Sequence, residues 1–318
     1  MNKNKKMNKD KLKRNIQLSW FTIPGVIWLA VFAYLPMFGL ILAFKDYKNT
    51  TGNFFTSLFN SDWTLKNFDI FFKTNDAWMV TRNTIGYNII FIILNIIVPL
   101  LVAIMLHEML NQRGAKIYQT ATFLPYFLSW VVISYSIYAI LAPEVGLFNQ
   151  IRASLGLDTV SYYRNPRYWP FIYVFLNTWK SLGYNTVIYL AALSGIDKSL
   201  YEAASIDGAS KWQQTRYITI PLLRPVVTII FILALGGIFR SDFGLFFHVP
   251  NTGGGAATLR EVSEVIDTYT YKLLVQSQNL KQSAAIGFFQ SVVGFILIFT
   301  ANKIVKRYDP ERLSLIHI

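Results

Sequence analysis

Cysteine is absent from the 318 residues of the sequence, which excludes a disulfide framework, a thiol nucleophile and a metal site with cysteine ligands. Charged residues are also scarce. They make up 15% of the chain, whereas soluble domains carry roughly 25%. Hydrophobic residues make up 53%. This balance excludes an ordinary soluble domain and indicates an integral membrane protein.

Histidine is rare, and the carboxylates lie outside the long apolar stretches. A membrane-embedded enzyme would need convergent acids, histidines, or a nucleophile beside a base, yet His107, His248 and His317 are widely separated along the chain. No GxxxxGK[ST] motif occurs, so nothing in the sequence indicates a nucleotide site. We expect no enzymatic activity, and neither a cofactor nor a metal ion held by this chain.

Long apolar stretches dominate what is present. A hydrocarbon core of about 30 Å needs roughly 20 apolar residues in a helix. Six stretches have about this length and few or no charges: residues 20–44, 84–106, 117–141, 168–193, 222–239 and 284–304. The sequence therefore predicts an all-α membrane protein of about six transmembrane helices, which form one transmembrane domain over residues 20–305.

Basic residues outnumber acidic ones and give a net charge of +13. With the N-terminus inside, most lysines and arginines fall in segments that face the cytoplasm, as the positive-inside rule requires. The basic tail 1–19 and the C-terminal tail 306–318 are then both cytoplasmic. We interpret the excess of base as a sign of orientation in a bacterial cell membrane, held by anionic lipid headgroups, and not as a nucleic-acid site.

A polar stretch, residues 202–223, separates the fourth and fifth predicted spans. Ser199 and Glu202 have the spacing of a capping box, which predicts the start of a helix. Gly208 predicts its end, because glycine adopts a left-handed conformation without a steric penalty. Ser210 and Gln213 repeat the box and predict a second short helix through about residue 217.

We therefore expect a cytoplasmic helix-turn-helix element between spans four and five. Small side chains on the first helix allow a close approach to another surface. From the pattern alone two interpretations stay open: a helix that fits a groove of another protein, or an ordinary amphipathic connector at the membrane interface.

The spacing of Glu202-Ala203-Ala204, Gly208, Ile218 and Pro221 resembles the EAA signature of bacterial ABC importer permeases, EAA-x3-G-x9-I-x-L-P. One departure is Ile220, where leucine is usual. The segments LNTWKSLGYNTVIYLAALSGI, SDFGLFFHVP, VIDTYTYK and SAAIGFFQSVVGFILIFTANKIVKR are similar to the carbohydrate-uptake branch, of the LplB-like kind for complex saccharides and related to the maltose-type permeases. The resemblance covers nearly the whole chain from residue 20 onward.

This resemblance implies a role for each part of the signature. The helix from Glu202 to Gly208 would be the coupling helix, which sits in a cleft of an ATPase subunit. Glu202 would be its polar anchor, Ala203 and Ala204 its close-packing face, and Gly208 the bend that aims it. The short path through Ile218 and Pro221 would pass the motion to the fifth span as a rigid body.

The resemblance also implies partners. Such importers combine two permease subunits, here expected to be nonidentical, with two cytoplasmic ATPase subunits that bind ATP and Mg and an extracytoplasmic protein that delivers the sugar. The expected substrate is a carbohydrate, an oligosaccharide or complex glycan. Two alternatives remain: an ABC permease for a non-sugar solute such as peptide or polyamine and, more remotely, a membrane-embedded transferase. Arg240 and Asp242 flank the outer mouth of the fifth span and could pair with each other or with the binding protein.

Polar residues within spans are candidates for the solute pathway, because each needs a partner in hydrocarbon. The fourth predicted span offers Asn177, Trp179, Lys180, Tyr184 and Asn185. Asn177 and Tyr184 fall on one helix face, and amides, phenols and aromatic rings suit the hydroxyls and ring faces of a sugar. The alternative is that these side chains tie helices together or satisfy a kink near Gly183. Asn95 is expected to serve in packing.

Overall fold

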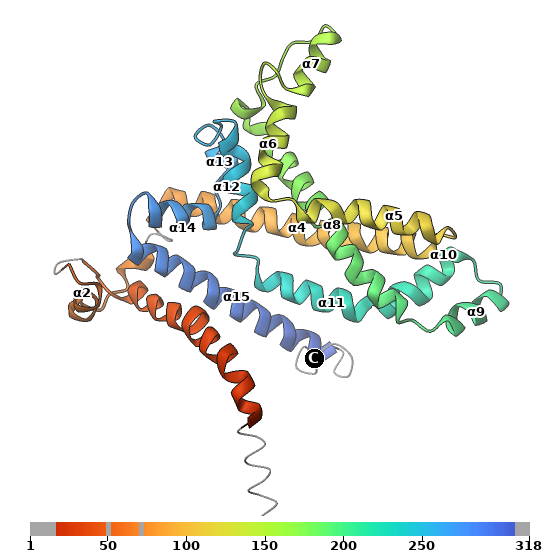
Figure 1. Cartoon of the computed structure of the whole chain (residues 1–318), viewed down its shortest axis with the longest axis horizontal. Coiled ribbons are helices and arrows are strands. Elements are labelled where there is room, and N and C mark those ends of the chain that lie inside the picture. Colours follow the sequence, from red (N-terminus) through yellow and green to blue (C-terminus); the bar gives the residue numbers. More distant parts are fainter. Residues whose placement is uncertain (1–16, 49–51, 70–72, 309–318) are drawn as a thin grey trace, which may run out of the picture.

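The computed structural model describes residues 17–48, 52–69 and 73–308, and in these ranges the chain is almost entirely helical. Long helices form its body: Gln17–Phe44, α4 (Asn75–Glu108), α8 (Trp169–Ser194), α11 (Ile220–Gly236) and α15 (Leu280–Tyr308). Shorter helices connect them: α2 (Phe54–Asn60), α5 (Gln112–Phe123), α6 (Trp130–Leu141), α7 (Leu147–Ser154), α9 (Lys198–Ile206), α10 (Lys211–Gln214), α12 (Phe243–Thr252), α13 (Arg260–Ser263) and α14 (Ile266–Val275). Figure 1 places α9 and α10 at one end of the long helices and α2 and α14 at the other.

Four helices of the described residues are long and apolar enough to cross a membrane: Gln17–Phe44, α4, the helix Lys211–Gly236 that includes α11, and α15. A bent pair gives a fifth span if it is counted as one. The 26-residue α8 covers the fourth predicted span but is not among the four, because tyrosine, tryptophan, asparagine and lysine interrupt its apolar residues. The all-α membrane fold is confirmed, with four or five spans by this measure where about six were predicted.

The third predicted span, residues 117–141, is not one straight helix. Helix α5 continues into a 3₁₀ turn, η4 (Leu124–Phe127), and α6 then departs at 100° after a two-residue break. Pro125 lies in the first turn of η4, and the Ser129 hydroxyl accepts a hydrogen bond from the Val132 N–H to begin α6. A proline followed by an N-cap serine stops one helix and starts another. The apolar composition of the segment conceals this break.

Helices α4 and α8 pack along each other over much of their length. At one end an aromatic cluster joins them to α12: the Tyr87 and Tyr173 rings meet edge to face at 5.7 Å, and the Phe246 ring lies 5.0 Å from Tyr87 and 4.8 Å from Tyr173. Edge-to-face and tilted aromatic pairs add to the stabilisation from burial itself. The cluster fixes α12 on the two long helices.

Gly183 brings the backbones of α8 and α5 into direct contact. A Cβ atom at this position would lie 2.3 Å from Phe123 Cα and 2.4 Å from the Thr122 carbonyl oxygen. Glycine is needed here for close approach, as is common where membrane helices cross. The expected kink near Gly183 is therefore better described as a contact point, since α8 is helical throughout.

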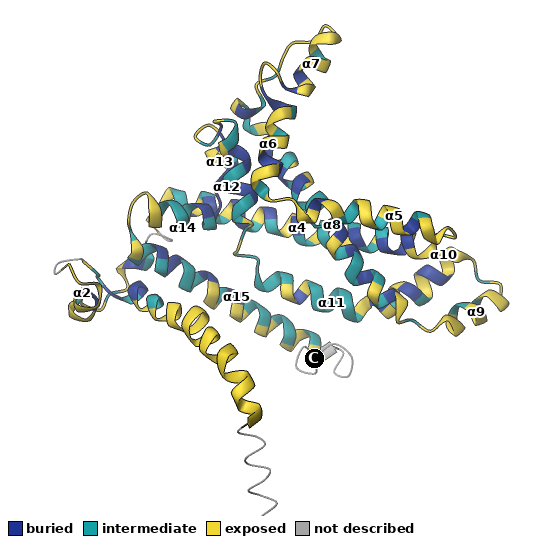
Figure 2. Cartoon of the chain, in the orientation of Figure 1, coloured by how far each residue is buried: buried dark blue, intermediate teal, exposed yellow. Residues whose placement is uncertain are grey.

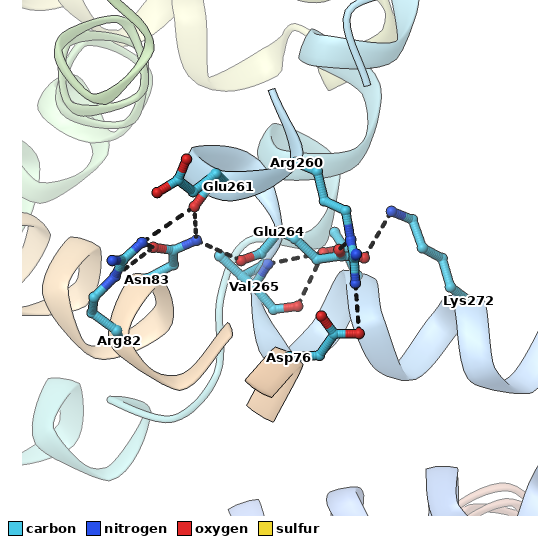
Figure 3. Close-up of polar contacts among 9 residues, drawn as sticks. Asp76, Arg82, Asn83, Arg260, Glu261, Glu264, Val265 and Lys272 are labelled. Carbon is cyan, nitrogen blue, oxygen red and sulfur yellow. Dashed lines mark hydrogen bonds and ion pairs between the residues drawn. The ribbon is translucent and has the colours of Figure 1, made fainter. Parts of the chain in front are cut away.

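A network of charges ties the start of α4 to α13 and α14 (Figure 3). Glu264 is only 2% exposed, and its carboxylate pairs with the guanidinium of Arg260 and, at 2.7 Å, with the ammonium of Lys272. Arg260 reaches on to Asp76 at 2.7 Å. A buried carboxylate is tolerated when it is paired and hydrogen-bonded in this way. The network holds α13 and α14 on the start of α4.

Replacing Glu264 by glutamine is expected to lower the thermal unfolding midpoint of the purified protein, because two basic side chains lose their shared carboxylate. Asp69→Asn is the matched control, since Asp69 pairs with Lys73 in an exposed contact, and exposed pairs contribute roughly 0–1 kcal/mol. Differential scanning fluorimetry in detergent would compare them. Equal midpoints for both variants would contradict a structural role for the buried pair.

The first long helix, Gln17–Phe44, presents apolar side chains outward (Figure 2). Phe21 is 85% exposed, and Trp20 and Trp28 are also exposed. Only its final part, η2 (Leu35–Phe44), packs on the rest of the chain, chiefly on α15. An apolar helix with so little cover within its own chain needs lipid or another protein around it.

Candidate coupling surface and solute pathway

The polar stretch forms the helix, turn and helix that its spacing predicts, but the first helix begins differently. Helix α9 starts at Lys198, and its N-cap is Asp197, whose Oδ1 accepts from the Ser199 N–H at 2.9 Å. Hydrogen bonds from the Ser199 backbone and side chain hold the pKa of Asp197 below its usual value. The predicted Ser199–Glu202 capping box is therefore wrong. An aspartate two residues earlier supplies the cap, since Asp is as good an N-cap residue as Ser.

Gly208 ends α9 with a backbone φ of +80°. The Ala209 N–H donates to the Ala204 carbonyl at 2.9 Å and the Gly208 N–H to the Ser205 carbonyl at 3.1 Å, which satisfies the last carbonyls of the helix. A Cβ atom at Gly208 would meet nothing within 4 Å. The backbone conformation alone therefore requires glycine here, as the sequence predicted.

The predicted Ser210–Gln213 capping box is present, with the Ser210 N–H donating to Gln213 Oε1 at 2.7 Å. The second helix does not stop near residue 217, however. Helix α10 passes through a π-helical turn, η7 (Thr215–Thr219), directly into α11. One helix runs from Lys211 to Gly236, and Pro221 lies within it. The turn at Gly208 is thus joined to the fifth predicted span without a break.

Three contacts fasten the back of α9 and its turn to this continuous helix. Gln214, which is buried, donates through Nε2 to Ser205 Oγ at 2.8 Å and to the Ala209 carbonyl at 3.2 Å. The hydroxyls of Tyr201 and Thr219 lie 3.0 Å apart. These bonds hold the first helix at a set angle to the second.

The η7 turn is bound to the end of α4 as well. Thr215 Oγ1 donates to Glu108 Oε1 at 2.6 Å, so a side-chain bond joins the end of α4 to the segment between α9 and α11. Helix α9 is therefore connected through this turn to both α11 and α4.

The opposite side of α9 is open. Glu202 and Ala203 are exposed, Leu200 is exposed beside them, and Ile206 is 86% exposed at the end of the helix. Ala204 lies half-buried, as do Ile218 and Pro221 further along. A short helix with one apolar and acidic face exposed and the other face hydrogen-bonded is suited to docking in a groove.

The polar residues of α8 do not share one environment. Asn177 Oδ1 accepts from Asn95 Nδ2 at 2.8 Å, and the Ser181 hydroxyl donates to Asn95 Oδ1 at 2.8 Å. Asn185 Nδ2 lies 3.5 Å from the Asn95 carbonyl. These contacts join α4 to α8, so Asn177 and Asn185 lie where interhelical ties are expected. Asn95 serves in packing, as predicted.

Lys180 holds the break between α5 and α6. Its Nζ donates to the carbonyls of Tyr126 at 3.0 Å, Pro125 at 3.4 Å, and Leu128. The Pro125 carbonyl also accepts from the Leu128 N–H at 3.2 Å, so for this carbonyl Lys180 is a second donor. Trp179 is half-buried and packs against the aromatic core. Neither side chain projects freely, and the Lys180 ammonium faces backbone carbonyls of the chain.

Tyr184 is the predicted pathway residue with an accessible surface. Its ring stacks on that of Tyr126 from η4, with centroids 4.9 Å apart and an interplanar angle of 12°. The two side chains are 45% and 43% exposed. We call Tyr126 and Tyr184 the tyrosine pair. It offers an aromatic surface with phenol groups, which suits a sugar.

Sequence reasoning missed Tyr126 and a neighbouring contact. Trp130, the first residue of α6, donates through Nε1 to Asp242 Oδ2 at 2.7 Å, and Arg240 donates instead to Ser291 Oγ at 3.2 Å. Arg240 and Asp242 therefore do not use each other as partners. The segment LPYFLSW, with its proline and capping serine, was the signal that could have located this corner.

The chain belongs to the family of the binding-protein-dependent transport system inner membrane component, which matches residues 95–310. It is a membrane-embedded permease component of the ABC importer type, and not an enzyme. The EAA spacing identified from the sequence lies within the matched residues, and the resemblance is confirmed.

Relatives and solved structures agree with this family. The chain is 31% identical to the polygalacturonan/rhamnogalacturonan transport system permease protein YteP of Bacillus subtilis (strain 168), over 95% of this chain and 91% of YteP. It is 31% identical to protein LplB of the same organism, over 95% and 92%. A bacterial ABC transporter involved in the import of the acidic polysaccharide alginate matches with a TM-score of 0.84 and 29% identity, covering 95% of this chain and 99% of that one. The same kind of transporter in complex with an alginate pentasaccharide-bound periplasmic protein gives 0.82.

Proposed function

We propose that this chain is one of two nonidentical permease subunits of an ATP-driven importer of oligosaccharides or complex glycans. Two cytoplasmic ATPase subunits, which carry ATP and Mg, would power it, and an extracytoplasmic protein would deliver the sugar. The observation that carries the proposal is α9, with its exposed outer face, its hydrogen-bonded back and its unbroken connection to α11. Both termini would lie in the cytoplasm.

In this proposal α9 is the coupling helix. Glu202 offers a charge to a basic or N–H donor group of the ATPase, and Ala203 and Ala204 let the two surfaces approach closely. Gly208 sets the direction of the helix. A docking site made of one short helix transmits force only if it is braced, and Tyr201 and Gln214 supply that bracing.

The permease would alternate between two conformations. ATP binding to the ATPase subunits would shift this equilibrium only if the ATP-bound ATPase binds one conformation more tightly than the other. Closure of the ATPase pair would move α9, and the helix Lys211–Gly236 would carry the displacement across the membrane. The Thr215–Glu108 bond would carry part of it into α4. Ile218 and Pro221 lie inside this path, where the signature places them.

The tyrosine pair is the part of the predicted pathway that we assign to the solute. Aromatic rings stack on the apolar face of a sugar ring, and phenol hydroxyls can bond its hydroxyls. Asn177, Lys180 and Asn185 act on the solute through the shape they give to α4, α5 and α8. Trp179 supports the same wall from within the core.

The test is reconstitution of the complete transporter with its binding protein, followed by a glycan screen for stimulated ATP hydrolysis and uptake into vesicles. A glycan that stimulates both supports the proposal. Stimulation by a peptide or polyamine, with none by any glycan, would support the non-sugar alternative in its place.

Tyr184→Ala is expected to raise the glycan concentration for half-maximal uptake by about fivefold, because an aromatic contact contributes roughly 0.5–1.5 kcal/mol. Tyr184→Phe, which keeps the ring and loses only the hydroxyl, should lie between Tyr184→Ala and the wild type. Hydrolysis without glycan should be unchanged in both. Unaltered uptake by Tyr184→Ala would remove the tyrosine pair from the pathway.

A further inference from the structure

The described residues 52–69, which we call the return segment, fold back on the end of the first long helix. The Thr64 N–H donates to the Phe44 carbonyl at 2.9 Å. The side-chain amide of Asn67, which is buried, donates to the Lys45 carbonyl at 2.9 Å. These bonds fix the return segment, which includes α2, at the end of that helix, opposite α9 (Figure 1).

The first long helix sets the depth of the return segment in the bilayer. Its 28 residues give a length of about 42 Å at helical rise, and a bilayer with its headgroup regions is about 40–45 Å thick. A spanning helix of this length has its last residue, Phe44, at the level of the headgroups. The return segment is bonded to Phe44 and therefore lies at the same level, which is the outer leaflet in the proposed orientation.

Helix α2 divides its surface into three faces. Leu58 is buried against the rest of the chain. Phe55 and Phe59, four residues apart, form a phenylalanine face and are 67% and 77% exposed. Thr56 and Asn60 are also exposed and form a polar face, about 100° further around the helix. A helix with this division is suited to a membrane interface, where the apolar face enters lipid and the polar face meets water.

Trp63 and Leu65 extend the exposed apolar surface beyond α2, with 72% and 69% of their surface open. The Lys45 ammonium lies 4.4 Å from the centre of the Trp63 ring and donates to the Ser61 carbonyl at 2.7 Å. This cation–π contact holds the ring in place. Tryptophan and lysine are the side chains that anchor a helix where it leaves the hydrocarbon.

We propose that the return segment is an interfacial anchor, in which Phe55, Phe59, Trp63 and Leu65 insert into the headgroup and upper acyl region of the outer leaflet. Its partner is lipid. The segment is fixed to the end of a spanning helix, and its apolar and polar faces are both open and lie side by side along α2, as a boundary between lipid and water requires. Only η2 of the first long helix packs on the rest of the chain, so the anchor would hold the depth of that helix.

The test places the photoreactive phenylalanine analogue p-benzoylphenylalanine at one position of α2 in the complete transporter, in phosphatidylcholine nanodiscs. On irradiation this group bonds to neighbouring lipid or protein. With the analogue at Phe59, mass spectrometry of this chain is expected to show a mass increase of one phosphatidylcholine. Phe55 on the same face should give the same result. Asn60 is the matched control, since it is the next residue and equally open but lies on the polar face, and its lipid adduct should be several times weaker.

Basal ATP hydrolysis before irradiation checks that each substituted transporter is assembled. An adduct of the Phe59 analogue with another permease subunit or with the binding protein, in place of lipid, would overturn the proposal and make the phenylalanine face a docking surface. The proposal also fails if Phe59 gives no lipid adduct, or if Phe59 and Asn60 give equal amounts. A lipid adduct at Phe59 in a transporter that no glycan stimulates would support the anchor and leave only the transport function in question.

Discussion

Substitution of Gly208 by valine is expected to reduce glycan-stimulated ATP hydrolysis and uptake by about tenfold or more in the reconstituted transporter. Gly208 has a φ of +80° with no atom near its Cβ direction, so the effect arises from backbone conformation and not from a clash. A residue with a side chain is unfavourable in this conformation by roughly 1–2 kcal/mol. The turn would relax and α9 would point elsewhere, away from its partner.

The control for this variant is Gly156→Val. Gly156 has a φ of +70° and equally open surroundings, but it follows α7, at the other side of the membrane in the proposed topology. The same local strain there should leave coupling close to the wild type. Equal losses in both variants would show that strain alone impairs the protein. Full coupling in Gly208→Val, at normal protein level, would contradict the assignment of α9.

Substitution of Lys180 by methionine is expected to abolish most uptake and to lower the thermal unfolding midpoint of the purified transporter by about 5 °C or more. The ammonium group donates to carbonyls of Pro125, Tyr126 and Leu128. Methionine removes all three of these bonds, and a hydrogen bond from a charged group contributes roughly 1.5–3 kcal/mol; among the described residues, only the Pro125 carbonyl keeps another donor, the Leu128 N–H. The break between α5 and α6, and with it the position of Tyr126, would lose its support.

Lys180→Arg is the informative companion, because it keeps the charge and several donors but has a different shape. It should recover part of the thermal stability that methionine loses. If Lys180→Met unfolds at the wild-type temperature and only loses uptake, Lys180 contacts the solute itself, and the structural role assigned to it is wrong. Both variants are measured by scanning fluorimetry and by vesicle uptake.

Local rules predicted the coupling element well, because its turn and its second cap depend on residues close together in the chain. Gly208 and the Ser210–Gln213 box lie where they were predicted. The N-cap of α9 was predicted at the wrong residue, because Asp197 and Ser199 are both good N-cap residues and the sequence pattern does not rank them. The continuity of α10 with α11 was not predicted. A π-helical turn ahead of Pro221 joins the two helices, and the residue spacing gives no sign of such a turn.

The pathway was predicted less well, for a reason that lies in tertiary contacts. Asn177 is bound by Asn95, 82 positions away in the sequence, and Lys180 by carbonyls more than fifty positions away. Polarity within a span indicates that a side chain has a partner, and it does not say whether that partner is protein or solute. Tyr126 was missed because apolar composition hid the corner on which it lies.

The contact at Gly183 limits how this subunit can change shape. A glycine that touches the Phe123 backbone leaves no clearance for sliding between α5 and α8, and packed interfaces of this kind change by discrete steps rather than smoothly. The two helices should therefore tilt together as one block, with the tyrosine pair carried along intact. Alternation between outward and inward access would then take place at the borders of that block and not within it.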